Sequence, residues 1–144
     1  MIGYSHHLGD MQGGPRLTAA KRNVHFLTFS YTADTISDAM VAKLKAGLVV
    51  RGVFERQNAG GSGADFNRLK QGGVDVLEDG NCYILHHKVI VIDERTVITG
   101  SYNFTGSAEH DNDENLVIVD DPATFRSCSV PRFSMPLPSF ALPF

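Results

Sequence analysis

The stretch His86-His87-Lys88-Val89-Ile90-Val91-Ile92-Asp93, followed after six residues by Gly100-Ser101-Tyr102-Asn103, is the part of this chain that decides its fold. It has the pattern H-x-K-x4-D-x6-G-S-x-N. The β-branched residues after the His-His-Lys run predict a strand over 86–93. A second strand is predicted over 96–104, and the short connection at 93–95 would let the two strands pair as a hairpin.

Side chains alternate between the two faces of a strand, and this alternation sorts the polar residues of the motif. His86 and Lys88 are expected on one face, while His87 and Asp93 point the other way. Two residues of the second run share a face by the same rule, Ser101 and Asn103. An imidazole, an ammonium group, a hydroxyl and an amide would then converge on one spot.

Residues 86–115 resemble the HKD motif of the phospholipase D superfamily. The likeness continues past the second run as Phe104-Thr105, Ala108-Glu109 and Glu114-Asn115. It is similar to the short one-motif bacterial endonucleases of that superfamily, or to one half of a two-motif phospholipase D-like protein. The resemblance implies an α/β fold, with a mixed β-sheet flanked by helices in an α/β/α sandwich.

The resemblance also implies a role for each polar residue of the motif. His86 matches the histidine that attacks phosphorus to give a phosphohistidine, or its partner that protonates the leaving group. Lys88 and Asn103 match the pair that holds the phosphate, and Ser101 matches a supporting hydroxyl. Glu114 matches the carboxylate that orients the histidine through its other ring nitrogen.

Two further motif residues are expected to be structural, Asp93 and Gly100. The strand position of Asp93 favours an ion pair or a turn contact over a role in chemistry. Glu109 is an alternative to Glu114 as the carboxylate, but a solvated charge on a helix or loop is the preferred interpretation.

These residue types suit the hydrolysis of a phosphodiester without a metal or other cofactor. The substrate is negatively charged, and a lysine with amide donors neutralises it and its transition state. A metal site built from His86, His87, His110 and Glu114 is the weaker alternative. The two adjacent histidines are expected on opposite faces, and no H-x-x-x-H or C-x-x-C spacing exists.

The rest of the chain predicts alternating elements around this hairpin. Helices are expected over 15–22, 32–46 and 64–71, and strands over 24–31, 48–54, 74–77 and 116–119. We therefore expect one phospholipase D-like domain over 15–125, after an irregular segment at 1–14. The stretch 126–144 contains four prolines, which exclude a helix or a central strand. Relatives usually have an amphipathic helix there, so one face of the sheet is expected to stay exposed.

The composition of the chain bears on whether it binds nucleic acid or a membrane. The net charge of −3 over 144 residues gives no general basic field for nucleic acid. A local basic groove could still be formed by Arg16, Lys21, Arg22, Arg51, Arg56, Arg68 and Lys70. No apolar run is long enough to span a membrane and no signal peptide is visible, so a cytoplasmic location is expected for the chain as given.

The sequence therefore predicts a phospholipase D-like phosphodiesterase, with nucleic acid as the favoured substrate. One motif supplies half a site, so the partner is either a second copy in a C2 homodimer or a missing second half. A catalytically incomplete fragment or binding domain is one alternative. A phospholipid headgroup hydrolase is the other.

Overall fold

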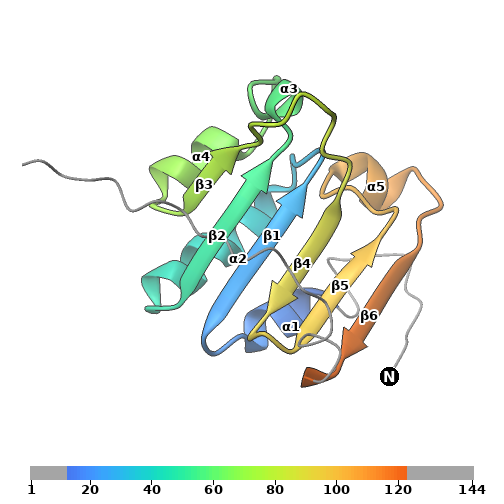
Figure 1. Ribbon diagram of the computed structural model, residues 1–144. Helices are drawn as coiled ribbons and strands as arrows, with labels where there is room; N and C mark the ends of the chain where they lie inside the picture. The colour runs from blue at the N-terminus through green and yellow to red at the C-terminus, as the bar shows by residue number, and fades with distance from the viewer. Residues whose placement is uncertain (1–12, 123–144) are drawn as a thin grey trace, which may run out of the picture.

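The computed structural model describes residues 13–122, and within this range six strands form one mixed sheet (Figure 1). The strands are β1 (Asn23–Thr28), β2 (Val49–Phe54), β3 (Asp75–Glu78), β4 (Lys88–Ile92), β5 (Thr96–Gly100) and β6 (Leu116–Asp120). Their order in the sheet is β3-β2-β1-β4-β5-β6. β1, β2 and β3 are parallel, whereas β4 pairs antiparallel with β1 and β5, and β5 pairs antiparallel with β6.

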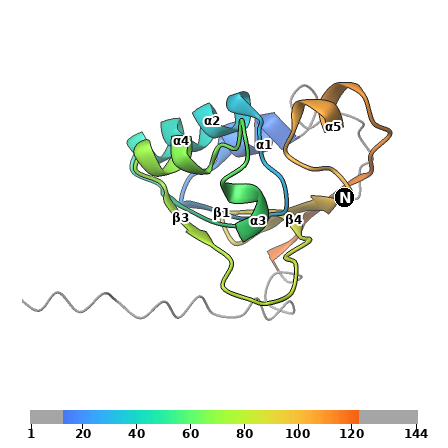
Figure 2. The same cartoon turned by 90° about the horizontal axis from the view of Figure 1, so that it is seen from above.

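Helices cover one face of this sheet (Figure 2). They are α1 (Gly13–Ala19), α2 (Asp34–Lys45), α4 (Phe66–Gln71) and α5 (Gly106–His110). α3 (Arg56–Ala59) is a single turn directly after β2. The predicted α/β fold, a mixed sheet flanked by helices, is confirmed. Within residues 13–122, no helix covers the opposite face, which is lined by residues such as Leu27, Val89 and Val91.

The core lies between the sheet and these helices. Burial alternates along β1, where Val24, Phe26 and Thr28 point into the core. The Phe26 ring packs edge-on against Tyr31 and Phe54, with centroids 5.8 and 5.7 Å away. Burying each such ring contributes about 1.5–3 kcal/mol. This aromatic cluster therefore stabilises the segment that follows β1, which contains Tyr31.

Gly52 makes room for this cluster. It is the partner of Phe26 in the β1–β2 register. A Cβ atom at Gly52 would lie 2.1 Å from the Phe26 ring, closer than any carbon contact allows. The Phe26 ring therefore occupies the space in which any other residue at position 52 of β2 would place its side chain.

The predicted helix at 32–46 forms as α2, which begins at Asp34. Ala33 is the N-cap and no side chain caps the helix, although Thr32 and Asp34 are the residue types that usually do so. Asp34 lies in the first helical turn, where its charge complements the helix dipole. The helix ends before Gly47, which adopts a φ of 90°.

Three predicted strand boundaries are wrong because the chain changes partner near the motif. The strands predicted over 24–31 and 96–104 end at Thr28 and Gly100, and the one predicted over 86–93 begins at Lys88. Beyond β1, Tyr31 instead forms an isolated bridge with Phe104. Sequence periodicity does not report such a change of partner.

Residues 1–12 and 123–144 lie outside the described range, so the irregular N-terminal segment and the Pro-rich C-terminal stretch remain predictions. None of the helices between residues 13 and 122 is long and apolar enough to cross a membrane.

Candidate phosphodiesterase site

The two runs of the motif meet where β1 and β5 end and β4 begins, which we call the site end of the sheet (Figure 1). The N–H of Phe29 donates to the carbonyl of His87 at 2.9 Å. The N–H of Phe104 donates to the carbonyl of Ser30 at 3.2 Å, and Thr32 returns a bond to Phe104 at 2.8 Å. Residues 29–32 therefore lie between the two runs and bring them together.

His86 and Lys88 are in contact at this end. The Lys88 Nζ atom lies 3.3 and 3.4 Å from the two ring nitrogens of His86 and 3.2 Å from its carbonyl oxygen. Phe29 lies beside both, with its ring centroid 4.5 Å from that of His86 and 5.0 Å from the Lys88 Nζ. His86 precedes β4, so the alternation of side chains along a strand does not set its orientation. Its contacts with Phe29 and Lys88 position the imidazole instead.

Lys88 is a buried cation. Its side chain points to the helix-covered face and the residue is 6% exposed. Burial lowers the pKa of the Lys88 ammonium below its ordinary 10.5, and the negative charge of Glu114 acts in the opposite direction. A desolvated ammonium group gains more from an anionic ligand than an exposed one does, because water screens it less.

Ser101 and Glu114 form the second polar group of the site. The Ser101 hydroxyl donates a short hydrogen bond to the Glu114 carboxylate, and accepts one from the Asn115 N–H at 3.0 Å. Glu114 also accepts from the Asn112 amide at 3.2 Å. The hydrogen bonds of Glu114 in the described chain thus go to Ser101 and Asn112, and its negative charge also acts on the Lys88 ammonium.

Asn103 and Gly100 complete the second run. The Asn103 Oδ1 atom is buried and accepts no hydrogen bond within residues 13–122. Such an atom is costly to leave unsatisfied. Gly100 lies against the next strand, where a Cβ atom would come within 2.1 Å of the Asn115 carbonyl oxygen. The glycine therefore permits the close approach of β6 that places Glu114 and Asn115 beside Ser101.

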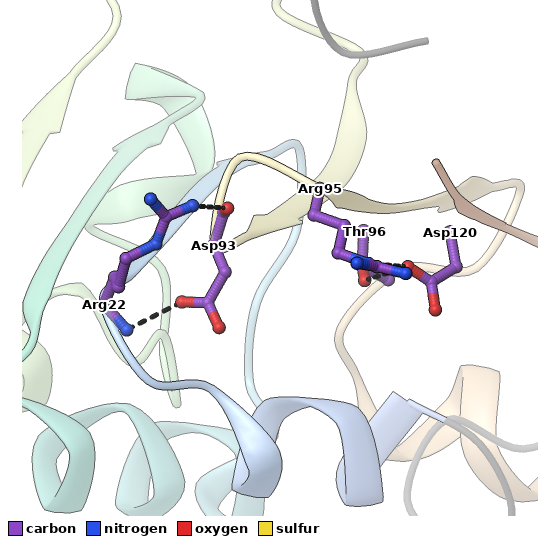
Figure 3. Close-up of polar contacts among 5 residues, drawn as sticks. All are labelled: Arg22, Asp93, Arg95, Thr96 and Asp120. Carbon is purple, nitrogen blue, oxygen red and sulfur yellow. Dashed lines mark hydrogen bonds and ion pairs between the residues drawn. The ribbon is translucent and has the colours of Figure 1, made fainter. Parts of the chain in front are cut away.

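Asp93 lies at the other end of the hairpin (Figure 3). Its carboxylate accepts the backbone N–H groups of Lys21 at 2.9 Å, Arg22 at 2.7 Å and Asn23 at 3.1 Å. The Arg22 guanidinium also donates to the Asp93 carbonyl. Burial raises the pKa of the Asp93 carboxyl, but these donors outweigh it and hold the pKa below its ordinary 3.8.

Asp93 and Glu94 form the turn itself. Both have a φ of 55°, and the Arg95 N–H donates to the Ile92 carbonyl at 3.0 Å. This is the two-residue turn with positive φ at both central positions that matches the twist of a hairpin.

Glu109 is not the solvated charge that the sequence suggested. It is half-buried and accepts a short hydrogen bond from the hydroxyl of Tyr102, which is 2% exposed. The reason is that Tyr102 points into the core and needs a partner for its hydroxyl near α5.

Sequence reasoning missed Phe29 and Glu55. Glu55 is 4% exposed and follows β2. Its carboxylate caps α3 by accepting the Gln57 N–H at 3.2 Å, and accepts the Leu85 N–H at 2.5 Å. The signal was an acidic residue directly after an apolar strand, a position that favours an N-cap. Nothing in the sequence marks Phe29.

Several of the predicted groove cations are engaged elsewhere. Arg51 pairs with Asp75 at 3.0 Å. Arg68 pairs with Asp34 and Asp38 at 2.6 and 2.7 Å. Arg56 follows Glu55 and is exposed at the site end. Between residues 13 and 122, no group of three or more His, Cys, Asp or Glu side chains is placed to hold a metal ion.

Comparison with known proteins shows the family of the chain. The family described as "Cardiolipin synthase, PLD-like domain" matches residues 15–130. The chain is 32% identical over 111 residues to a mitochondrial cardiolipin hydrolase of Chlamydomonas reinhardtii, covering 77% of this chain and 50% of that protein. It is 32% identical over 106 residues to a phospholipase D of Rickettsia prowazekii, covering 74% and 52%.

Two solved structures have the same fold. Nuc from Salmonella typhimurium, a phospholipase D family member, superposes with a TM-score of 0.74 at 34% identity, covering 88% of this chain and 86% of that one. NucT from Helicobacter pylori superposes with a TM-score of 0.77 at 22% identity, covering 88% and 91%, which shows the fold alone.

The fold and these relatives define the class as phospholipase D-like domains. The chain belongs to the phospholipase D superfamily. It spans about half the length of the curated relatives it matches.

Proposed function

We propose that this chain is a metal-independent phosphodiesterase that cleaves nucleic acid through a phosphohistidine, with His86 as the attacking residue. The observation that carries the proposal is the contact between the His86 imidazole and the buried Lys88 ammonium, 3.3 Å apart. Lysine can only donate hydrogen bonds, so its charge is available to an anionic oxygen next to the imidazole.

Each step of the reaction can be assigned to a residue at the site end. A ring nitrogen of His86 attacks phosphorus, and the bond from phosphorus to the leaving oxygen breaks. Lys88 and Asn103 hold the non-bridging oxygens and stabilise the charge of the transition state. Water then attacks the phosphohistidine, the P–N bond breaks, and a phosphomonoester is released with His86 regenerated.

A second motif supplies the acid. The attacking and leaving groups lie roughly in line on opposite sides of phosphorus, so one imidazole cannot serve both. A second His86, from a copy related by a twofold axis, gives its proton to the leaving oxygen and later takes one from the attacking water. The pairing of two chains also doubles the number of lysine and asparagine side chains around the phosphate.

Nucleic acid is the proposed substrate because the chain resembles the short one-motif endonucleases and covers 86% of Nuc. A phospholipid headgroup hydrolase is the second candidate. It is favoured by the names of the curated relatives, a cardiolipin hydrolase and a phospholipase D. A fragment of a two-motif protein, inactive alone, is the third, since the matched region covers only about half of each of those relatives.

The test is to incubate the chain, in excess chelator, with a single-stranded oligonucleotide and with cardiolipin or phosphatidylcholine vesicles. Sedimentation of the same samples gives the oligomeric state. We expect oligonucleotide cleavage whose specific activity falls on dilution as the dimer dissociates. Cleavage of the vesicles alone would support the lipid candidate, and an inert monomer at every concentration would support the fragment. Full specific activity in a monomer would refute the shared site.

A further inference from the structure

Two neighbouring apolar side chains are exposed shortly before His86 in the chain. Among the described residues, four large hydrophobic side chains are exposed, and the two most exposed are Tyr83 at 84% and Ile84 at 59%. They precede His86 by three and two residues. A single exposed hydrophobic residue is ordinary, but an adjacent pair beside a polar site is a candidate for ligand contact.

The backbone that carries this pair is fixed on both sides. The Asp79 N–H donates to the Phe54 carbonyl at 2.8 Å, and the Leu85 N–H donates to the buried Glu55 carboxylate at 2.5 Å. Between these anchors the chain projects from the sheet on the side without helices (Figure 2). Tyr83 and Ile84 are therefore exposed on a segment anchored at both ends, and Leu85, the second anchor, directly precedes His86.

We infer that Tyr83 and Ile84 form a base-binding subsite for the nucleotide next to the scissile phosphate of single-stranded nucleic acid. The inference rests on the proposed function and adds the strandedness of the substrate and the residues that contact its base. Three residues of chain keep Tyr83 within about 11 Å of His86, the reach of the next nucleotides along a strand. Bases stack on exposed aromatic rings in a sequence-tolerant way, and single strands have bases free to do so.

A lipid surface is the less suitable ligand for this pair. Two side chains offer less apolar surface than one acyl chain, which by itself gives only marginal membrane binding. The pair also has a polar amide close by in the same segment, Asn81. A flat ring with a polar hydroxyl fits a nucleobase better than it fits hydrocarbon.

The experiment measures oligonucleotide binding in chelator, using 2-aminopurine beside the central phosphate as a stacking probe. All proteins carry His86→Asn, so that the substrate stays intact. Adding Tyr83→Ala should weaken binding about 5- to 150-fold and abolish quenching of the probe, whereas Tyr83→Phe should retain both. Val49→Ala is the matched control, because Val49 is 47% exposed at the far end of β2.

The outcomes separate this inference from the proposed function. An abasic analogue at the probe position should reduce binding to the parent as much as Tyr83→Ala does. Equal affinity of the Tyr83→Ala and parent proteins, with cleavage by wild type intact, would overturn the subsite and leave the function standing. If wild type cleaves only vesicles, the nucleic-acid function fails and the subsite with it. Loss of vesicle binding instead of oligonucleotide binding on Tyr83→Ala would reassign the pair to lipid.

Discussion

At the turn end of the β4–β5 hairpin, the Asp93 carboxylate accepts three backbone N–H groups, whereas at the site end the Asn103 Oδ1 accepts none from the described residues. The same contrast holds for the cations. Arg22 at the turn end is bound to Asp93, while Lys88 at the site end is buried against an imidazole and a ring. The motif carboxylate at the turn end is thus bonded to the chain, whereas the motif amide oxygen at the site end has no partner among the described residues.

His86→Ala should give the largest effect. It removes the proposed nucleophile, so we expect turnover to fall by at least about 10³-fold while the protein stays folded. The control is His87→Ala, because the His87 carbonyl, which the substitution keeps, is what bonds Phe29. Equal losses in two folded variants, measured by steady-state kinetics and circular dichroism, would contradict the assignment.

Lys88→Gln should have the next largest effect, a fall in kcat of about 10²–10³-fold, because it removes one charged donor from the transition state. Removing a buried charge does not by itself threaten the fold. A small loss of kcat in Lys88→Gln, measured by steady-state kinetics, would argue against Lys88 as the phosphate cation.

Glu114→Gln should lower activity about 10- to 100-fold, as loss of a supporting carboxylate usually does. The Glu114 charge raises the pKa of Lys88 against the effect of burial. Its removal should therefore move the alkaline limb of the pH–rate profile to lower pH. Glu109→Gln, which alters a carboxylate bonded to Tyr102, should leave that limb in place, and a greater loss of activity from it would reverse the assignment.

Asp93→Asn should have the smallest effect on activity and act on stability, by about 1–2 kcal/mol. The pKa of Asp93 is lowered in the folded state, so its stabilisation is present above the ordinary value and is lost as pH falls through the folded value. Denaturant unfolding of wild type and Asp93→Asn at pH 7 and at acid pH measures the loss of stability and its dependence on pH. A variant as stable as wild type at pH 7, or one that loses turnover while folded, would erase the contrast between the two ends.

The sequence predicted most of the fold, for a physical reason, whereas the roles of the motif residues stay predictions. The hairpin, the parallel strands and α2 have strong local periodicity, and the motif residues are close in sequence. The contribution of Phe29 and Glu55 was not predictable, because both reach the motif through contacts made only after the sheet assembles. The partner of Tyr102 was missed likewise, since the hydrogen bond to Glu109 depends on where α5 packs.

The Phe26 ring fills the space above Gly52, and this has a consequence for how the protein can evolve. Neither position can vary alone: a side chain at 52 displaces the ring, and a smaller residue at 26 leaves a cavity behind residues 29–32. The two positions should therefore change together among close relatives, with a larger residue at 52 accompanied by a smaller one at 26. Relatives in which both positions differ should have a different packing of the aromatic cluster beneath residues 29–32.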